Sequence, residues 1–270
     1  MKVLGAGDNV IDRYCHAGVG YPGGNAVNFS VYAAMLGVNA AYQGIFADDR
    51  AAEHLKKVLT ARQIDISHCL TVAGESGYAS LTINDGERIF LESNAGGVRQ
   101  STAMDFMLAT RDWLAEFALI HTSAYSYIDH LLPALSTLPG KLSYDFSDDF
   151  LPGQALPLCK WLDYAFFSCA GKSLRETQHL LTAAQAQGCP LVVATRGVDG
   201  AILFDGVHWH EVKPVAIRPV DTLGAGDGFI TAFLLAHLQH KTLSASLDAA
   251  AVFASEICAL HGAFGEPLAL

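Results

Sequence analysis

A glycine-rich turn near the C-terminus carries the residue types that phosphoryl transfer needs. Gly224, Ala225 and Gly226 lie between an expected strand and an apolar helix over about 229–238, and Asp227 follows them directly. Small residues let successive backbone N–H groups point at one place, and the positive end of the helix dipole adds attraction for a phosphate. Asp227 would then lie where a carboxylate can take a proton from an attacking hydroxyl. The same residues also fit an ordinary strand-to-helix connection with an acidic first turn, so the turn alone leaves both interpretations open.

A second glycine pair lies about 200 residues earlier in the chain. Gly23 and Gly24 precede Asn25 and Asn28, and the segment leads into a helix that Gly37 would end in a left-handed conformation. Asn25 suits the N-cap position of that helix, and the glycine pair would also let the backbone approach a ligand closely. The two roles are compatible, because a cap uses one acceptor of the amide and leaves its donors available.

Strands and helices alternate along most of the chain. Strands are expected over 3–6, 40–46, 64–66, 118–122, 142–146, 164–168 and 191–194, and helices over 48–61, 105–114, 131–138 and 243–260. This alternation predicts an α/β fold with a doubly wound, mostly parallel sheet flanked by helices. Ligands bind such sheets at the carboxyl ends of the strands, where Asp8, Asn9 and Asp145 are expected. Polar turns in solvent explain these three residues equally well, so they stay unassigned.

Residues 70–97 interrupt the alternation. Residues 78–83 alternate in polarity, Asp85-Gly86 is a strong turn signal, and residues 88–91 return, which predicts a β-hairpin. The hairpin could be an edge of the main sheet or part of a separate small sheet.

The composition limits the classes of function. A chain of 270 residues suits one large α/β domain. Its net charge is −10, and its 17 basic residues form no long run, so the sequence gives no sign of a basic surface that would bind nucleic acid or anionic membranes. Six cysteines without a Cys-x-x-Cys pair indicate reduced, mostly buried thiols. No stretch has the character of a signal peptide or a membrane span, so a cytoplasmic location is expected.

Taken together, the two glycine-rich segments resemble the two signatures of the ribokinase-like (PfkB) carbohydrate kinases. Residues 221–227 resemble the C-terminal signature and residues 23–28 the first one, in the family's order, and the resemblance covers nearly the whole chain. It implies a ribokinase-like fold over residues 1–270 with a small β-sheet lid formed by about 13–20 and 70–97. It also implies that Gly224, Ala225 and Gly226 form the anion hole and that Asp227 is the catalytic base.

The resemblance further implies which residues hold the two substrates. Asp12 matches the family's N-terminal aspartate that grips sugar hydroxyls. The remaining expected sugar contacts are Gly24, Asn25, Asn28 and, from the hairpin, Arg88, and the expected contacts to the ATP phosphates are Thr195, Gly197 and Gly200. In many relatives the lid also pairs with a second subunit, so a homodimer through the lid is expected.

One departure from the family concerns the metal. Relatives place an Asn-x-x-Glu motif after the strand that matches 164–168, whereas this chain has Ser168-Cys169-Ala170-Gly171, and Glu176 is no convincing substitute. ATP and Mg²⁺ are the expected cofactors, with the metal held mainly by nucleotide phosphates and water, or else catalysis is impaired. The metal ligands stay unassigned. Many relatives bind a monovalent cation near the position of Asp221, but this sequence shows no clear set of ligands for such an ion.

Within the family, the chain is most similar to the members that phosphorylate fructoselysine at its 6-hydroxyl. That similarity rests on Gly7-Asp8-Asn9 with Asp12, on Val31-Tyr32, on residues 145–148 and on His261-Gly262-Ala263. The expected activity is ATP-dependent phosphorylation of a fructosamine-type (Amadori) sugar. Two alternatives stay open: a kinase for fructose, another ketose derivative or a nucleoside, and a non-catalytic sugar or nucleotide sensor.

Overall fold

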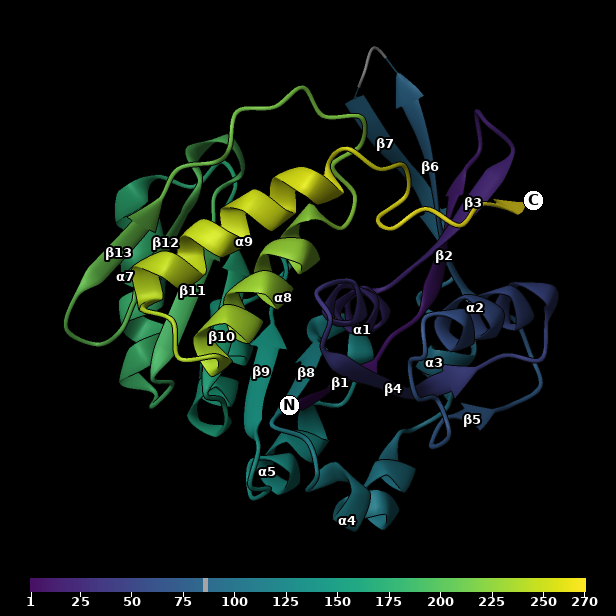
Figure 1. The fold of residues 1–270 in the computed structure, drawn as a ribbon, viewed down its shortest axis with the longest axis horizontal. Coiled ribbons are helices and arrows are strands. Elements are labelled where there is room, and N and C mark those ends of the chain that lie inside the picture. The colour runs from purple at the N-terminus through teal and green to yellow at the C-terminus, as the bar shows by residue number, and fades with distance from the viewer. Residues whose placement is uncertain (85–86) are drawn as a thin grey trace.

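A large, mostly parallel sheet forms the centre of the protein (Figure 1). The computed structural model describes residues 1–84 and 87–270, and the side chains of 83, 84, 87, 88 and 90 are also outside the description. Neighbouring strands of this sheet run parallel except at one edge, where the two outermost strands are antiparallel to their neighbours. The strand order is β13 (Trp209–Val212), β12 (Ala201–Phe204), β11 (Leu191–Thr195), β10 (Tyr164–Ser168), β9 (Lys141–Asp145), β8 (Leu119–Ser123), β1 (Lys2–Gly7), β4 (Asn39–Phe46) and β5 (Leu70–Thr71). The predicted fold class is confirmed.

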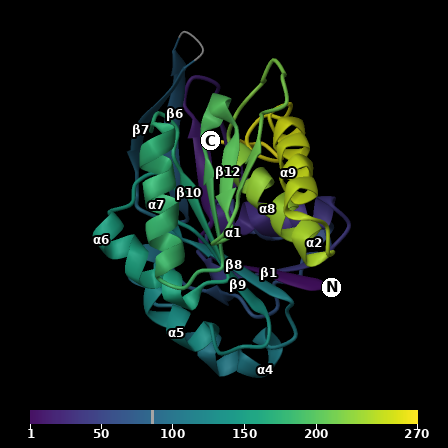
Figure 2. The ribbon, with the colours of Figure 1, turned by 90° about the vertical axis from the view of Figure 1, so that its left-hand side faces the viewer.

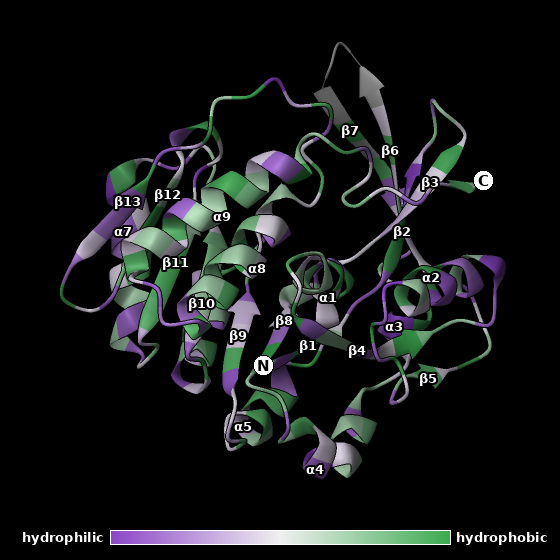
Figure 3. Ribbon diagram, in the orientation of Figure 1, coloured by the Kyte–Doolittle hydropathy of each residue, from purple (hydrophilic) through white to green (hydrophobic). Residues whose placement is uncertain are grey.

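Helices cover both faces of the large sheet (Figure 2). Helices α8 (Ala225–Leu238) and α9 (Leu243–Ile257) lie on one face together with α1 (Asn25–Met35), and α7 (Leu174–Ala186) lies on the other. The α8 helix is buried along most of its length because α1 and α9 pack on it and its Phe233 contacts Phe166 of β10. Its residues are mainly hydrophobic (Figure 3). The other α-helices are α2 (Arg50–Ala61), α3 (Val98–Ser101), α4 (Arg111–Leu114), α5 (Leu132–Leu135) and α6 (Pro152–Ala155), and the 3-10 helices are Asp105–Thr110, Ala124–Ser126, Asp129–Leu131, Leu156–Trp161 and Gly197–Asp199.

A separate five-stranded sheet rises beside the carboxyl ends of the large sheet (Figure 1). Its order is β14 (Leu268–Ala269), β3 (Val19–Gly23), β2 (Val10–Tyr14), β6 (Gly77–Asn84) and β7 (Glu87–Ser93). The chain enters it directly from β1, since only Asp8 and Asn9 separate β1 from β2. Asp8 and Asn9 are therefore fixed at one end by a strand of the large sheet and at the other by a strand of the small sheet.

Close packing fixes α1 against the large sheet. A Cβ atom on Gly5 of β1 would lie 2.1 Å from the carbonyl oxygen of Ala26, so only glycine lets the helix lie this near to the strand. Asn9, which follows β1, is buried and donates hydrogen bonds to the Tyr42 hydroxyl and the Ile45 carbonyl of β4. The start of α1 and the end of β1 thus form one rigid unit.

Several element boundaries differ from those expected. Residues 64–66 do not form a strand; Asp65 makes a single bridge to Ala41, and residues 70–71 instead form β5 in the large sheet, outside the small one. The helix expected over 105–114 is a 3-10 turn followed by the short α4. The helix expected from 229 begins at Ala225, so the glycine-rich turn supplies its first turn. Within the described residues, no helix combines the length and the apolar character needed to cross a bilayer.

Candidate active site

The N-terminus of α1 is held by the carboxylate of Asp8. Asp8 Oδ2 accepts a hydrogen bond from the Asn25 N–H at 2.7 Å, and Oδ1 accepts from the Ala26 N–H at 3.3 Å. The hydroxyls of Ser123 and Ser126 also donate to Asp8 Oδ1, at 3.1 and 2.9 Å. The predicted N-cap role of Asn25 is wrong, because Gly24 occupies that position and Asp8 satisfies the free N–H groups of the first turn. The Asn25 side chain is consequently available for another contact.

Two asparagines on one face of α1 each donate to a different carboxylate. Asn25 Nδ2 lies 2.8 Å from Asp145 Oδ2, at the end of β9, and Asn28 Nδ2 lies 2.7 Å from Asp227 Oδ2, in the first turn of α8. Residues three apart on a helix project in nearly the same direction, so α1 lines up these two acids side by side. The Asn28 side chain is 4% exposed, and its Oδ1 atom has no hydrogen-bond partner.

Asp12 belongs to the same region but comes from the small sheet. It is buried on β2, and a Cβ atom on Gly23 would lie 2.3 Å from its Oδ2 atom, so the carboxylate rests directly on the glycine pair that precedes α1. Gly24 has φ of 102°, a conformation that favours glycine, and its Cβ would lie 2.9 Å from the Asn9 Cα atom. The structure thus brings Asp12, Gly24, Asn25 and Asn28 together.

Two carboxylates of the site, Asp145 and Asp227, have raised pKa values. Burial raises the pKa of Asp227 well above its usual range, and the charges of Asp145, Asp8 and Asp12 raise it further, whereas the Asn28 hydrogen bond opposes the shift. Burial also raises the pKa of Asp145 to about 6. A carboxylate with a raised pKa is a stronger base once it is ionised, which is the property required of a group that takes a hydroxyl proton.

The glycine turn presents free N–H groups next to Asp227. Gly224 caps α8 with φ of 75°, and its missing side chain makes room for the buried hydroxyl of Tyr32, which a Cβ would approach to 2.3 Å. The first N–H groups of a helix have no intrahelical acceptor, and those of Gly226 and Asp227 belong to this set. Space beside Gly226 is open, since a Cβ there would meet nothing within 4 Å. An anion can therefore reach the end of α8 beside the carboxylate.

Asp221 fixes the turn from behind. Its Oδ1 atom accepts the Leu223 N–H at 3.0 Å, and its Oδ2 atom accepts the Gly262 N–H at 3.0 Å and the Tyr14 hydroxyl at 2.5 Å. Tyr14 lies on β2, so this contact ties the small sheet to the glycine turn. Nothing in the sequence pairs these two residues, which are 207 positions apart.

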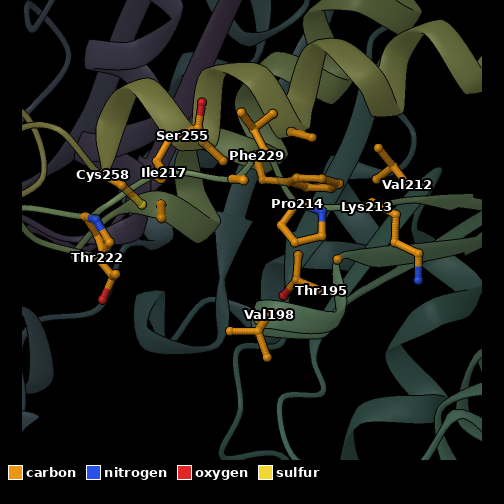
Figure 4. A pocket seen from close by; sticks show the side chains of 18 of the residues that line it. Thr195, Val198, Val212, Lys213, Pro214, Ile217, Thr222, Phe229, Ser255 and Cys258 are labelled. Carbon is orange, nitrogen blue, oxygen red and sulfur yellow. The ribbon is translucent and has the colours of Figure 1, made fainter.

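A cavity of about 580 Å³ extends from the glycine turn along the carboxyl edge of the large sheet (Figure 4). Ala225 and Gly226 line it together with Thr195, Gly197 and Gly200. Its other walls are mainly apolar, with Val198, Pro214, Ile217, Phe229, Ala251 and Ala254 among them. Figure 4 shows Thr222 at one end, Lys213 towards the other and the Phe229 ring between them. The shape suits a flat heteroaromatic base in the apolar part and phosphates near Gly226.

The described residues form no magnesium cage. At the end of β10, Cys169 is buried, and Glu176 is engaged in a capping box in which it accepts hydrogen bonds from both the N–H and the hydroxyl of Ser173. No group of three or more potential metal ligands occurs among the residues searched, which exclude the masked part of the hairpin. The Arg88 side chain, expected to reach the substrate, also lies outside the described residues.

Sequence reasoning left Asp145, Tyr14 and the apolar segment 212–219 out of the site. Asp145 carried a usable signal, because it follows an expected strand at the edge where ligands bind. The other two carried none, since their roles depend on how distant segments pack.

Comparisons with known proteins show which proteins the chain is similar to. The model of the pfkB family carbohydrate kinases matches residues 4–139 and 164–267. The fructosamine kinase FrlD of Bacillus subtilis (strain 168) is 38% identical over 266 residues, covering 98% of this chain and 93% of the relative. The fructoselysine 6-kinase of Escherichia coli (strain K12) is 31% identical over 268 residues, covering 98% of this chain and all of the relative. Among solved structures, Arabidopsis thaliana ribokinase complexed with ribose and ATP has a TM-score of 0.82 at 17% identity, covering 98% of this chain and 94% of that one.

Proposed function

The chain belongs to the pfkB family of carbohydrate kinases, and from that premise we propose that it transfers the γ-phosphate of ATP to the 6-hydroxyl of a fructosamine-type sugar such as fructoselysine. Two relatives named for activity on such sugars support the choice of acceptor, since they match the chain over nearly its full length. The single observation that carries the catalytic part is the pairing of Asn28 with Asp227 beside the open glycine turn, at the end of the 580 Å³ cavity.

In this proposal Asp227 takes the proton of the attacking hydroxyl. Its raised pKa gives it basicity, and the hydrogen bond from Asn28 holds the carboxylate in one orientation without an opposing charge. The free N–H groups of Gly226 and Asp227 stabilise the charge that grows on the transferred phosphoryl group, and they need no rearrangement because the helix start fixes them.

The acceptor lies between the two sheets. Asp12 and the backbone at Gly24 face it from the small-sheet side, and Asn25 and Asn28 face it from α1. ATP supplies the phosphoryl group and lies in the cavity with its base in the apolar part and its phosphates near Thr195, Gly197 and Gly200. Mg²⁺ accompanies ATP, whose phosphates together with water can fill the coordination shell of the ion.

The small sheet acts as a lid over the acceptor. The Tyr14–Asp221 hydrogen bond supports this role, because it links a lid strand to the glycine turn. The lid also mediates a homodimer through the β7 edge, where Ile89 and Leu91 are 43% and 55% exposed, whereas β14 covers the β3 edge. Sedimentation at micromolar concentration would give a dimer mass, and a monomer mass would contradict the dimer without affecting the kinase assignment.

A panel of acceptors tests the function. The protein is incubated with ATP and Mg²⁺ and with fructoselysine, a second fructosamine, fructose or a nucleoside, and ADP formation is followed with Asp227→Asn as the control for a contaminating kinase. The fructosamines should give the highest kcat/KM, with product phosphorylated at the 6-position by NMR. A preference for fructose or a nucleoside would move the protein to another acceptor within the family.

The departure at Ser168–Gly171 favours a second candidate, a non-catalytic sensor, because the family glutamate is missing there. Its test is the same panel. ADP formation that depends on both the acceptor and Mg²⁺ eliminates the sensor. Binding of a sugar, detected as a rise in melting temperature without any turnover, would establish it in place of the kinase.

A further inference from the structure

Two carboxylates in the proposed acceptor site, Asp145 and Asp227, lack a cationic partner among the described side chains. Among the described side chains, no lysine or arginine forms an ion pair with Asp145 or Asp227, although both acids lie at the meeting point of α1, β9 and α8. Asp227 is accounted for by the proposed chemistry. Asp145 is not, and buried charges in proteins are normally paired or engaged with a ligand.

The hydrogen bonds of Asp145 leave it able to accept another donor. Oδ1 accepts the Ser147 N–H at 2.9 Å and Oδ2 accepts Asn25 Nδ2 at 2.8 Å, so each oxygen keeps a further lone pair. An independent sign of an absent ligand lies one helical turn along α1. There Asn28 Oδ1 is buried without a partner, and such an atom is normally satisfied by something that binds.

The surroundings of Asp145 favour a cation in particular. The loop after β9 carries exposed Asp148 and Asp149. Tyr125 is 44% exposed and its hydroxyl lies 3.2 Å from Ser147 Oγ, which places an aromatic side chain beside the same loop. Carboxylates and an aromatic ring are the groups that bind an ammonium ion. The raised pKa of Asp145, about 6, fits a buried carboxylate whose counter-charge arrives with a ligand.

The chemistry of the acceptor supplies such a cation. A fructosamine carries a secondary amine on C1, which is protonated near neutral pH, and C1 lies at the opposite end of the sugar from the 6-hydroxyl. The asparagines that hold Asp227 and Asp145 have Cβ atoms about 5–6 Å apart, as expected for a spacing of three on a helix. An acceptor whose 6-hydroxyl meets Asp227 can therefore direct its other end towards Asp145.

We propose, on the basis of the proposed function, that Asp145 is a specificity-determining residue. Its carboxylate forms an ion pair with the protonated amine of the acceptor. Fructosamines are thereby distinguished from fructose, which has a hydroxyl on C1. Asn25 positions the carboxylate, and Asp148 and Asp149 add attraction at longer range.

The test compares a charged and a neutral acceptor in two variants. kcat/KM is measured for fructoselysine and for fructose with wild type, with Asp145→Asn and with Asp112→Asn, an exposed carboxylate in α4, as the control. Removing one partner of a desolvated charge pair should lower kcat/KM for fructoselysine about 30-fold or more, mainly through KM. The value for fructose should change less than threefold, and Asp112→Asn should change neither value by more than threefold.

An equal loss with both acceptors would overturn the inference and leave the proposed function standing. A wild type that phosphorylates fructose but not fructoselysine would overturn both. If Asp145→Asn does not fold, the wild type is assayed with the ether of fructose in which oxygen replaces the bridging nitrogen. That neutral analogue should lose the same 30-fold in kcat/KM, and equal use of ether and amine would refute the ion pair.

Discussion

The two halves of the site, one proposed for the nucleotide and one for the acceptor, are lined by different chemical groups. The cavity proposed for ATP is lined mainly by aliphatic side chains and by small residues, and the phosphate end uses backbone N–H groups. The acceptor half instead gathers four acids, Asp8, Asp12, Asp145 and Asp227, around the start of α1. Apolar walls and backbone amides contribute to stability, whereas the carboxylates of Asp145 and Asp227, whose pKa values are raised, oppose it. The half of the site proposed for the acceptor therefore gains its function at a cost in folding stability.

The largest effect should come from Asp227, the residue proposed as the catalytic base. Asp227→Asn keeps the hydrogen bond to Asn28 within reach but removes the base, so kcat should fall about 10²- to 10⁴-fold while KM for either substrate changes little. Steady-state kinetics measures both values, with Asp112→Asn, at an exposed position in α4, as the control. A kcat within tenfold of wild type would show that Asp227 is not the catalytic base.

Two glycine variants in the turn at the start of α8 distinguish an effect on folding stability from an effect on catalysis. Gly224→Ala places a methyl group against Tyr32 at a φ of 75°, and this strain of about 1–3 kcal/mol should lower the melting temperature together with kcat. Gly226→Ala meets no atom within 4 Å, so the melting temperature should stay or rise while kcat falls about tenfold, because the methyl group crowds the phosphoryl position. Equal melting temperatures with unchanged kcat would remove the turn from the site.

Filling the apolar cavity should affect only the nucleotide half. Ala254→Leu adds three carbon atoms to the wall and should raise KM for ATP about tenfold, a change of about 1.4 kcal/mol, without changing KM for the acceptor. Val252→Leu, an exposed change on the same helix, is the control. A larger effect on the acceptor than on ATP would reverse the assignment of the two halves.

The smallest expected effect is thermal and concerns Asp145. Its pKa rises to about 6 on folding from an ordinary 3.8, so the native state holds the proton more tightly, and ionisation costs about 1–3 kcal/mol of stability at neutral pH. Asp145→Asn, which resembles the protonated acid, should therefore raise the melting temperature by a few degrees above pH 6, with the difference vanishing as pH falls towards 4. Calorimetry between pH 4 and 7.5 measures this, and a destabilised variant at pH 7 would contradict the cost assigned to this charge.

The sequence predicts the fold class and the two glycine segments because local patterns encode them. Alternating strands and helices define a doubly wound sheet, and the order of the two signatures adds specificity. Asn28 and Asp227 each lie in such a segment, but their 2.7 Å contact joins residues 199 positions apart and depends on how α1 packs on α8. Local reasoning fails at Asn25 for the same reason, because Asp8, 17 residues earlier, takes the capping role. The role of Asp145 could not be assigned from the sequence, because the same residue types occur in solvent-exposed turns and in turns that contact a ligand.

The mainly apolar lining of the cavity proposed for ATP has a consequence for selective inhibition. A compound that imitates the adenine ring would meet aliphatic walls and main-chain groups, which offer few features that distinguish one ATP-dependent enzyme from another. A compound that instead carries an amine towards the end of β9 and a phosphate mimic towards Gly226 would draw its discrimination from the acidic half. Such a bisubstrate design would use the carboxylates around the start of α1 in addition to the phosphate position at Gly226.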